Sequence, residues 1–351
     1  MFWLTLLLAA NFVPQNATLY RQPQLAASGD LAAVTFGAEH AIYFALSHDA
    51  GKHWDETVKV ASPSTLSLGN HRGPRVAIAG KVMVISAIAV KQGGGKEGDL
   101  LSWRSSDGGK TWQEGPAISD APGAAREGLH AMAAAPDGRL FATWLDLRNL
   151  SAGKPGTELW GAYSTDAGVT WSRNVLVYKS PSGSICACCH PSAMFSSDGA
   201  LEVMWRNEMN GNRDMFIIRS KDGGRTFGEA AKLGSGSWKL NACPMDGGGM
   251  AQSADGKIIT VWRRETKIYT ASDGGAETLL HDGKNPALAV SKEGLFTAWT
   301  SPEGVWAHVP GRAEPVQLDQ EGGFVTLTAI AKGGVLAAWE RKGTIQFHTL
   351  P

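Results

Sequence analysis

The chain has 351 residues, 43% of them hydrophobic and 19% charged, so it can bury a large core and does not have the composition of a disordered protein. Lysine plus arginine equals aspartate plus glutamate at 33 each, and the formal net charge is zero. This balance argues against the basic surface that neutralises a phosphate backbone, so nucleic acid is not an expected partner.

The chain starts with an apolar run, MFWLTLLLAANFVPQNA, that has the length of a signal peptide and ends in small residues. No lysine or arginine precedes the run. It is shorter than the about 20 apolar residues that cross a bilayer, and no later segment qualifies, so we expect no membrane span. We therefore predict a signal peptide at residues 1–17, a secreted or periplasmic protein, and a single domain at residues 18–351.

A glycine followed by a short apolar strand recurs seven times along the chain, and several copies end in tryptophan. The copies are GDLAAVTF (29–36), GKVMVISA (80–87), GRLFATW (138–144), GALEVMW (199–205), GKIITVW (256–262), GLFTAW (294–299) and GVLAAWE (334–340). None has a helical period, so the repeat predicts an all-β fold. A β-propeller of seven blades, with six as the alternative, closes such repeats and leaves few exposed edges. We expect the segment ATLYR (17–21) to supply the strand that closes the ring.

A second motif follows most of these strands at intervals of 51 to 59 residues. Its copies are SHDAGKHW (47–54), SSDGGKTW (105–112), STDAGVTW (164–171), SKDGGRTF (220–227) and the decayed ASDGGAET (271–278). The serine and aspartate side chains suit a turn in which they bond backbone groups, while glycine supplies a positive φ and the aromatic residue packs beneath.

The motif S-x-D-x-G-x-T-W resembles the Asp-box, or BNR-repeat, proteins of the sialidase superfamily. The chain is also similar to a bacterial sialidase-like group that carries a C-x-C-C stretch. This resemblance implies a β-propeller whose Asp boxes lie on outer turns, away from the active site. Sialidases have six blades, whereas the repeat count here favours seven.

A proline precedes several of the glycine strands, which marks the start of the innermost strand of each blade. These segments are RQPQL (21–25), RGPRV (72–76), CCHPSA (188–193), ACPMDG (242–247) and KNPAL (284–288), with His130 in the corresponding place of the third copy. Inner strands line a propeller's central channel, so we expect their first residues to share one channel mouth. The residues expected there are Arg21, Arg72, Arg126, Glu127, His130, Cys188, Cys189, His190, Cys243 and Lys284.

The sialidase resemblance assigns roles to some of these residues. YRQPQL resembles the Arg-Ile-Pro signature, which makes Arg21 the first member of an arginine triad that binds a substrate carboxylate. The segment NGNRDMFIIRSKDGG resembles the Asn-x-Arg stretch of the family, which makes Arg213 a second arginine of the triad. Arg263 or Arg264 is the third arginine, and Glu208 is an acidic partner. The candidate catalytic residues are Arg21, Arg72, Glu127, His130, Glu208, Arg213 and Arg264.

The expected function is binding or exo-sialidase-type hydrolysis of an anionic glycan or small-molecule substrate by a monomer. The tyrosine nucleophile and aspartate acid of the family cannot be located, which leaves open whether the chain is an enzyme. The last tyrosine, Tyr269, directly precedes the fifth box, and the segment before the first box contains Glu39 but no aspartate.

The stretch SICACCHPSAMFSSDG (184–198) supports other functions. Cys186, Cys188, Cys189, His190 and Cys243 could bind copper or zinc, or form a redox site, since thiolates and imidazole suit these metals. In an exported protein the same four cysteines could instead form two disulfides. No other cofactor is expected, and a scaffold for protein partners is the third alternative.

Overall fold

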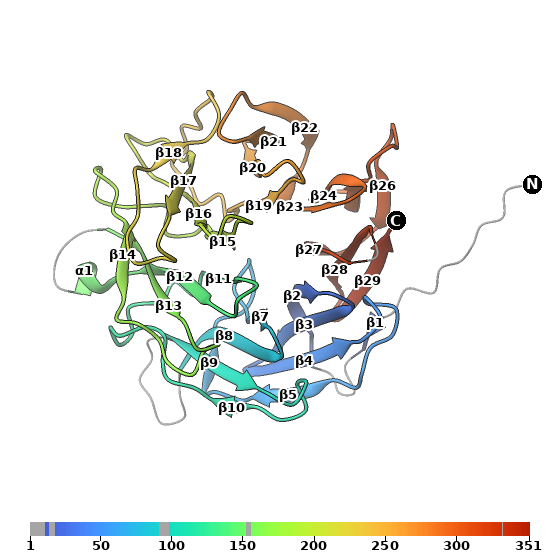
Figure 1. Cartoon of the computed structure of the whole chain (residues 1–351). Coiled ribbons are helices and arrows are strands. Elements are labelled where there is room, and N and C mark those ends of the chain that lie inside the picture. The colour runs from blue at the N-terminus through green and yellow to red at the C-terminus, as the bar shows by residue number, and fades with distance from the viewer. Residues whose placement is uncertain (1–10, 14–17, 91–97, 152–155, 332) are drawn as a thin grey trace, which may run out of the picture.

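The computed structural model describes residues 11–13, 18–90, 98–151, 156–331 and 333–351, in which almost all regular structure is β. Seven antiparallel sheets surround one axis, and their first strands lie next to one another around the centre (Figure 1). The chain is a seven-bladed β-propeller. This confirms the all-β prediction and favours the seven blades of the glycine-strand repeat over six.

In each of the first four blades the strands follow one another outward from the axis. Blade 1 contains β2 (Arg21–Ser28), β3 (Leu31–Ala38), β4 (Ala41–Ser47) and β5 (Val58–Ala61). Blade 2 contains β7 (Arg75–Ala79), β8 (Val82–Val90), β9 (Asp99–Ser105) and β10 (Gln113–Glu114), and β6 (Thr65–Leu66) also pairs with β8. Blade 3 contains β11 (His130–Ala134), β12 (Leu140–Asp146), β13 (Glu158–Ser164) and β14 (Val175–Tyr178), with α1 (Arg148–Ser151) after β12. Blade 4 contains β15 (Ser192–Phe195), β16 (Leu201–Arg206), β17 (Met215–Ser220) and β18 (Ala231–Lys232).

The last three blades follow the same plan, except that the outer strand of the seventh comes from the start of the chain. Blade 5 contains β19 (Gly249–Gln252), β20 (Ile258–Arg264), β21 (Lys267–Ser272) and β22 (Thr278–Asp282). Blade 6 contains β23 (Lys284–Ser291), β24 (Gly294–Ser301), β25 (Gly304–His308) and β26 (Val316–Asp319). Blade 7 contains β27 (Gly323–Ala329), β28 (Val335–Arg341), β29 (Thr344–Leu350) and β1 (Asn11–Phe12).

The strand that closes the ring is β1, so the expectation for the segment ATLYR is wrong. That segment ends in Arg21, which already pairs with Gly37 on the inner side of blade 1. β1 instead pairs with β29, and the Phe12 ring lies 5.0 Å from that of Phe347 and 5.8 Å from that of Phe36. β1 falls within residues 1–17, for which the signal peptide stays a prediction.

The five Asp-box segments join the third and fourth strands of blades 1 to 5. Because neighbouring strands are antiparallel, these turns lie at the opposite end of the ring from the starts of the inner strands. In the second box, Ser105 Oγ donates to Asp107 Oδ1 at 2.8 Å and accepts from the Gly109 amide at 2.9 Å. Trp112 Nε1 donates to the Gly109 carbonyl at 3.0 Å. The boxes are thus self-contained turns that hold the outer strands in place.

The box carboxylates should make the fold sensitive to acid. Partial burial opposes ionisation of Asp222, but hydrogen bonds from Thr226 and Ser220 outweigh it and lower the pKa to about 2. An aspartate whose pKa is lower folded than unfolded stabilises the protein above about pH 4, and this contribution is lost as the pH falls to about 2. We expect Asp222→Asn to reduce the unfolding free energy at pH 7 by less than about 1 kcal/mol, because the site is exposed. Thermal unfolding from pH 2 to 7 should show a shallower acid slope than in the wild type; identical slopes would contradict this.

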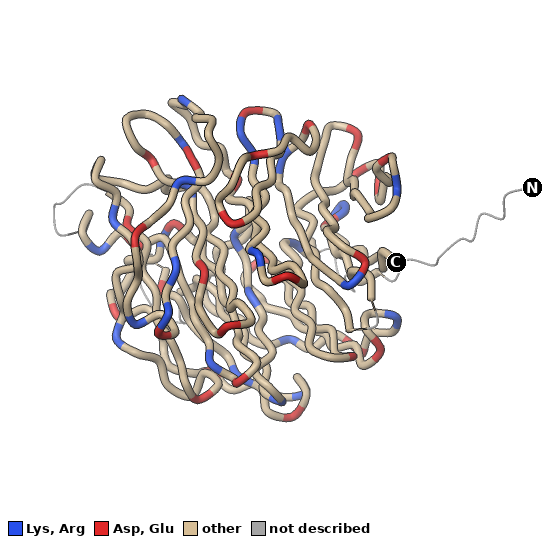
Figure 2. Tube along the Cα trace, turned by 45° about the horizontal axis from the view of Figure 1, so that its top comes forward, with Lys and Arg blue, Asp and Glu red and all other residues tan. Residues whose placement is uncertain are grey.

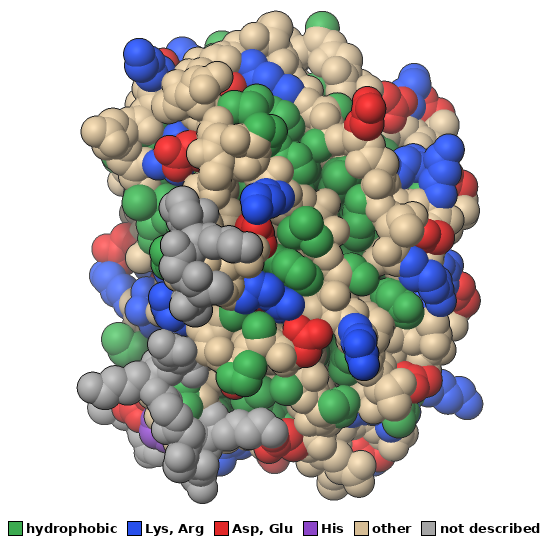
Figure 3. All heavy atoms as spheres, turned by 90° about the vertical axis from the view of Figure 1, so that its left-hand side faces the viewer, with side chains coloured by type: hydrophobic (Ala, Val, Ile, Leu, Met, Phe, Trp, Pro, Cys, Tyr) green, Lys and Arg blue, Asp and Glu red, His purple; other side chains and the backbone are tan. Residues whose placement is uncertain are grey.

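The tryptophans that end the repeated strands pack in the interior. Trp144 and Trp205 are fully buried, and Trp262, Trp299 and Trp339 are at most 5% exposed. Lysines and arginines alternate with acidic residues over the ring (Figure 2), and both signs also mix with hydrophobic side chains on the outer face near α1 (Figure 3). In the part of the chain that the structure describes, no helix has the length and hydropathy of a membrane span.

Candidate functional site

The starts of three inner strands share an unusual backbone conformation at one end of the channel. Gln22, Asn285 and Phe324 have φ values of 56°, 53° and 54°, in the left-handed region that residues other than glycine rarely adopt. Each stands at a break in register with the second strand of its blade. Such bulges redirect side chains, and here they turn a glutamine, an asparagine and a phenylalanine toward the channel mouth.

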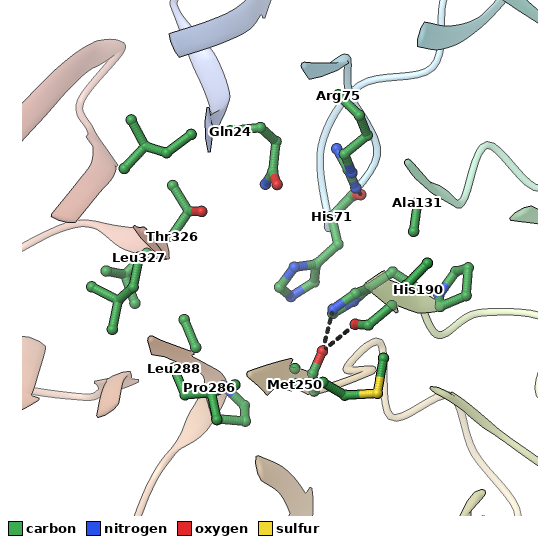
Figure 4. Close-up of a pocket in the computed structure, with 18 of the residues that line it drawn as sticks. Gln24, His71, Arg75, Ala131, His190, Met250, Pro286, Leu288, Thr326 and Leu327 are labelled. Atoms are coloured by element: carbon green, nitrogen blue, oxygen red, sulfur yellow. Dashed lines mark hydrogen bonds between the residues drawn. The ribbon is translucent and has the colours of Figure 1, made fainter. Parts of the chain in front are cut away.

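The channel contains an axial pocket of about 250 Å³, lined by Gln24 and Arg75 of inner strands and by His71 and His190 of the segments before β7 and β15 (Figure 4). The imidazole rings of His71 and His190 stack with centroids 4.2 Å apart. His71 Nε2 donates to Asn285 Oδ1 at 3.0 Å, and His190 Nε2 donates to the Gly248 carbonyl at 3.2 Å. Among the described residues, the buried Nδ1 of His190 has no hydrogen-bond partner.

Burial sets the charge state of this histidine pair. Desolvation lowers the pKa of His71, although the nearby charge of Asp246 opposes the shift. Desolvation also lowers the pKa of His190 well below its usual value, and His71 and Arg75 add to this effect. Both rings are therefore neutral at pH 7.

A second cavity, the mouth pocket, lies between blades 1, 6 and 7 and has a volume of about 280 Å³. Its charged lining residues are Arg21, Lys284, Lys342 and Glu340. Glu340 accepts a hydrogen bond from the Gln22 amide at 2.9 Å and lies 3.9 Å from Arg21. Burial raises the pKa of Glu340, although the Gln22 amide and Arg21 oppose the shift. The mouth pocket adjoins the axial pocket at Asn285, which lines the former and bonds His71 in the latter.

Arg21 owes its position to a glycine in the neighbouring loop. Gly69 has φ of 94°, and a Cβ atom there would lie 3.1 Å from Arg21 Nη1. The guanidinium therefore lies against bare backbone, and the Arg21 side chain keeps 41% of its surface exposed. It can bind a ligand in the mouth pocket without leaving its place.

Three of the four cysteines occupy the loop before β15. The sulfur of Cys186 lies 3.6 Å from that of Cys188 and 3.2 Å from that of Cys189, and all three residues are buried. We call these three residues the thiol cluster. All four cysteines of the chain are free, so neither of the two expected disulfides is present in the structure. Contacts with the other two sulfurs lower the pKa of Cys186, whereas burial raises the pKa of Cys189.

Cys243 and His190 lie outside the thiol cluster, in contrast to the expectation that all would meet. Cys243 is exposed, because the segment before β19 carries it to the surface. His190 turns its ring into the axial pocket instead. The proline pattern located the start of the strand correctly but could not fix the direction of these side chains.

The remaining candidates from the sequence are held by partners of their own. Arg72 donates to the Glu127 carbonyl at 2.6 Å, and burial raises the pKa of the Glu127 carboxyl. Arg213 pairs with Glu208 at 2.7 Å. Arg264 forms two hydrogen bonds with Glu277 and lies 4.0 Å from the Tyr269 ring centroid.

His130 is fully buried, so it does not face the mouth as expected. Its Nε2 lies 3.0 Å from Ser86 Oγ, and desolvation lowers its pKa well below the usual value. It is the first residue of β11, and its contact with Ser86 of β8 places its ring between blades 2 and 3.

Sequence reasoning missed His71, Asn285 and Glu340. The sequence pattern could have identified Glu340, because this residue directly follows the tryptophan of its repeat. Other copies have Arg206, Arg263 and Thr300 at the same position. The second strand of each blade runs toward the channel mouth, so a polar residue at its end lies there. His71 and Asn285 gave no such signal, since left-handed backbone depends on tertiary contacts.

The seven-bladed ring and its axial site define the class of this protein: a β-propeller built from Asp-box repeats. The BNR repeat-like domain matches residues 30–261, and the chain belongs to that family. Comparison with curated protein sequences gives no match.

Solved structures with the same fold include enzymes of several kinds. An α-L-arabinanase from Penicillium chrysogenum, in complex with arabinobiose, is 15% identical, with a TM-score of 0.56 over 95% of this chain and 93% of its own. A polysaccharide lyase described as an ulvan lyase is 10% identical, with a TM-score of 0.59 over 95% and 94%. A Hadza microbial sialidase is 17% identical, with a TM-score of 0.51 over 92% and 74%. At these identities the likeness is one of fold.

Proposed function

We propose that the protein binds an anionic carbohydrate in the mouth pocket, with Arg21 and Lys284 contacting the acidic group of one sugar unit. The observation that carries this proposal is the charge of the lining. Arg21, Lys284 and Lys342 surround a cavity in which Glu340 is the one acidic residue among the described lining. A guanidinium beside an ammonium is suited to a carboxylate or sulfate.

The size of the cavity supports a small ligand. A volume of about 280 Å³ is at the lower end of ligand pockets, which suits a single sugar unit. The arabinanase, the ulvan lyase and the sialidase that share the fold agree with this class of ligand.

Binding is better supported than sialidase-type cleavage. Retaining and inverting glycosidases place two carboxyl groups about 5 to 10 Å apart, and sialidases replace one of them by tyrosine. The mouth pocket has one carboxyl group, that of Glu340. Tyr20 also lines it, but its ring packs 4.7 Å from Phe36 and its hydroxyl bonds Thr57.

Calorimetry with a matched pair of oligosaccharides tests the proposal: one carries a terminal uronic or sialic acid, and the other carries the same sugar with its carboxyl group esterified. We expect only the acidic sugar to bind, and Arg21→Ala to weaken it about tenfold or more. Arg225→Ala, in the fourth Asp box at the other end of the ring, is the matched control and should bind normally. Equal affinity for both sugars, or normal binding by Arg21→Ala, would reject the proposal.

A further inference from the structure

We propose that Cys186, Cys188, Cys189 and Met245 form a binding site for one Cu(I) ion beside the axial pocket. The ligand atoms of the three cysteines all lie within 4.8 Å of one another. A metal bound at about 2.3 Å by three sulfurs requires sulfur separations of about 4 Å. The separations from Cys186 are 3.6 Å to Cys188 and 3.2 Å to Cys189, so the sulfurs need to move apart by less than about 1 Å to hold an ion.

The backbone holds this loop in place before any ion binds. The Cys186 amide donates to the Arg206 carbonyl at 3.0 Å, and the Ile185 amide donates to the Thr157 carbonyl at 2.9 Å. On the other side, a Cβ at Gly247 would lie 1.9 Å from the His190 carbonyl oxygen, so the segment before β19 packs directly against the loop. Two fixed segments therefore enclose the sulfurs.

Met245 supplies a second, independent observation. It has φ of 57°, a left-handed conformation that costs free energy for a methionine. This conformation brings its side chain against the three cysteines, and it is the one partly buried hydrophobic residue that packs on them in the part of the chain described. Met245 thus adds a thioether-bearing side chain to the contacts of the thiol cluster.

The donor set selects the ion. Of the described histidine, cysteine and acidic residues, only the three cysteines belong to this group of ligand atoms. Structural zinc sites complete a tetrahedron with cysteine, histidine or carboxylate ligands, which the cluster lacks. Soft thiolates and a thioether suit Cu(I).

The charge balance favours an anionic metal–thiolate complex. Arg206 is 1% exposed, and its guanidinium donates to three backbone carbonyls. No ion pair joins it to a carboxylate within the described residues, and its Nε donates to the carbonyl of Asp246, the residue after Met245, which places the cation beside the thiol cluster. Three thiolates around Cu(I) carry net negative charge, which compensates this buried cation.

The full-length chain, reduced and kept free of oxygen, is titrated with Cu(I) against a Cu(I) chelator, and native mass spectrometry counts bound ions. We expect one Cu(I) per chain. Cys188→Ser should lose it, whereas Cys243→Ser, a matched change outside the cluster, should retain it. Met245→Leu keeps the hydrophobic contact and should weaken Cu(I) binding about tenfold, which tests the site even if Cys188→Ser fails to fold.

Several results would overturn the proposal: no Cu(I) retained against the chelator, unchanged binding by Met245→Leu, or Zn²⁺ that an excess of Cu(I) does not displace. The site is independent of the proposed sugar binding. Arg21→Ala should therefore bind Cu(I) normally, and loss of sugar binding with Cu(I) retained separates the two proposals.

Discussion

Replacing Arg206 by alanine is expected to lower the unfolding free energy by about 3–5 kcal/mol, the largest loss among the changes considered for this chain. Its guanidinium joins three segments that are distant in sequence. Nε donates to the Asp246 carbonyl at 3.0 Å, Nη1 to that of Arg213 at 2.7 Å and Nη2 to that of Arg263 at 2.8 Å. Without it, three backbone carbonyls lose this donor, one of them in a fully buried bond and two in partly buried ones.

Two further variants test whether the loss of stability comes from the missing hydrogen bonds or from the missing side-chain volume. Arg206→Met keeps most of the side-chain volume but removes the donors, so it should lose nearly as much stability as Arg206→Ala if the hydrogen bonds dominate. Lys267→Ala is the control: that side chain is 41% exposed and pairs with the exposed Asp282 at 3.2 Å, so about 1 kcal/mol or less is expected. Denaturant unfolding measures all three. A loss for Arg206→Ala no larger than for Lys267→Ala would contradict this account.

The sequence predicted the scaffold well because the scaffold is repetitive. The glycine strands share one local sequence pattern and the Asp boxes share another, so both repeats can be recognised even where a copy has decayed, such as the one at Asp273. The closing strand is different. It consists of Asn11 and Phe12 alone, inside an apolar run, and no pattern of two residues can be recognised.

The site was predictable only where a residue's place in the repeat fixes its direction. Arg21 and Lys284 stand at the same point of two inner strands, and both line the mouth pocket. Cys243 also stands beside such a proline, yet the long segment before β19 takes it to the surface. The sequence does not distinguish the environments of Arg206 and Arg213. In the structure Arg206 is buried, whereas Arg213 pairs with Glu208.

Glu340→Gln should reveal a titrating group in the mouth pocket. Because burial raises its pKa, the folded protein binds more protons here than the unfolded chain does. The contribution of Glu340 to stability is therefore complete below about pH 4.5 and declines as the pH rises through the folded pKa. Glu127 and Glu202 also have raised pKa values and share this slope, so Glu340→Gln should remove only part of it.

The same change bears on ligand binding. When Glu340 is ionised, it competes for Arg21 and repels an anionic sugar; when protonated, it does neither. A unit charge about 5 Å away at an effective dielectric constant of about 20 contributes about 3 kcal/mol, and partial exposure of the pocket reduces this to about tenfold in affinity. We expect the wild type to bind the acidic sugar more weakly as the pH rises from 5 to 8.

In Glu340→Gln this pH dependence should disappear, and binding at pH 8 should be about tenfold tighter than in the wild type, because glutamine keeps the hydrogen bond with the Gln22 amide but carries no charge. Calorimetric titrations at several pH values measure both effects. Glu293→Gln, an exposed change in the turn between β23 and β24 at the other end of the ring, is the control and should follow the wild type. If Glu340→Gln instead bound the sugar more weakly at every pH, Glu340 would be a direct ligand of the sugar rather than a competitor for Arg21.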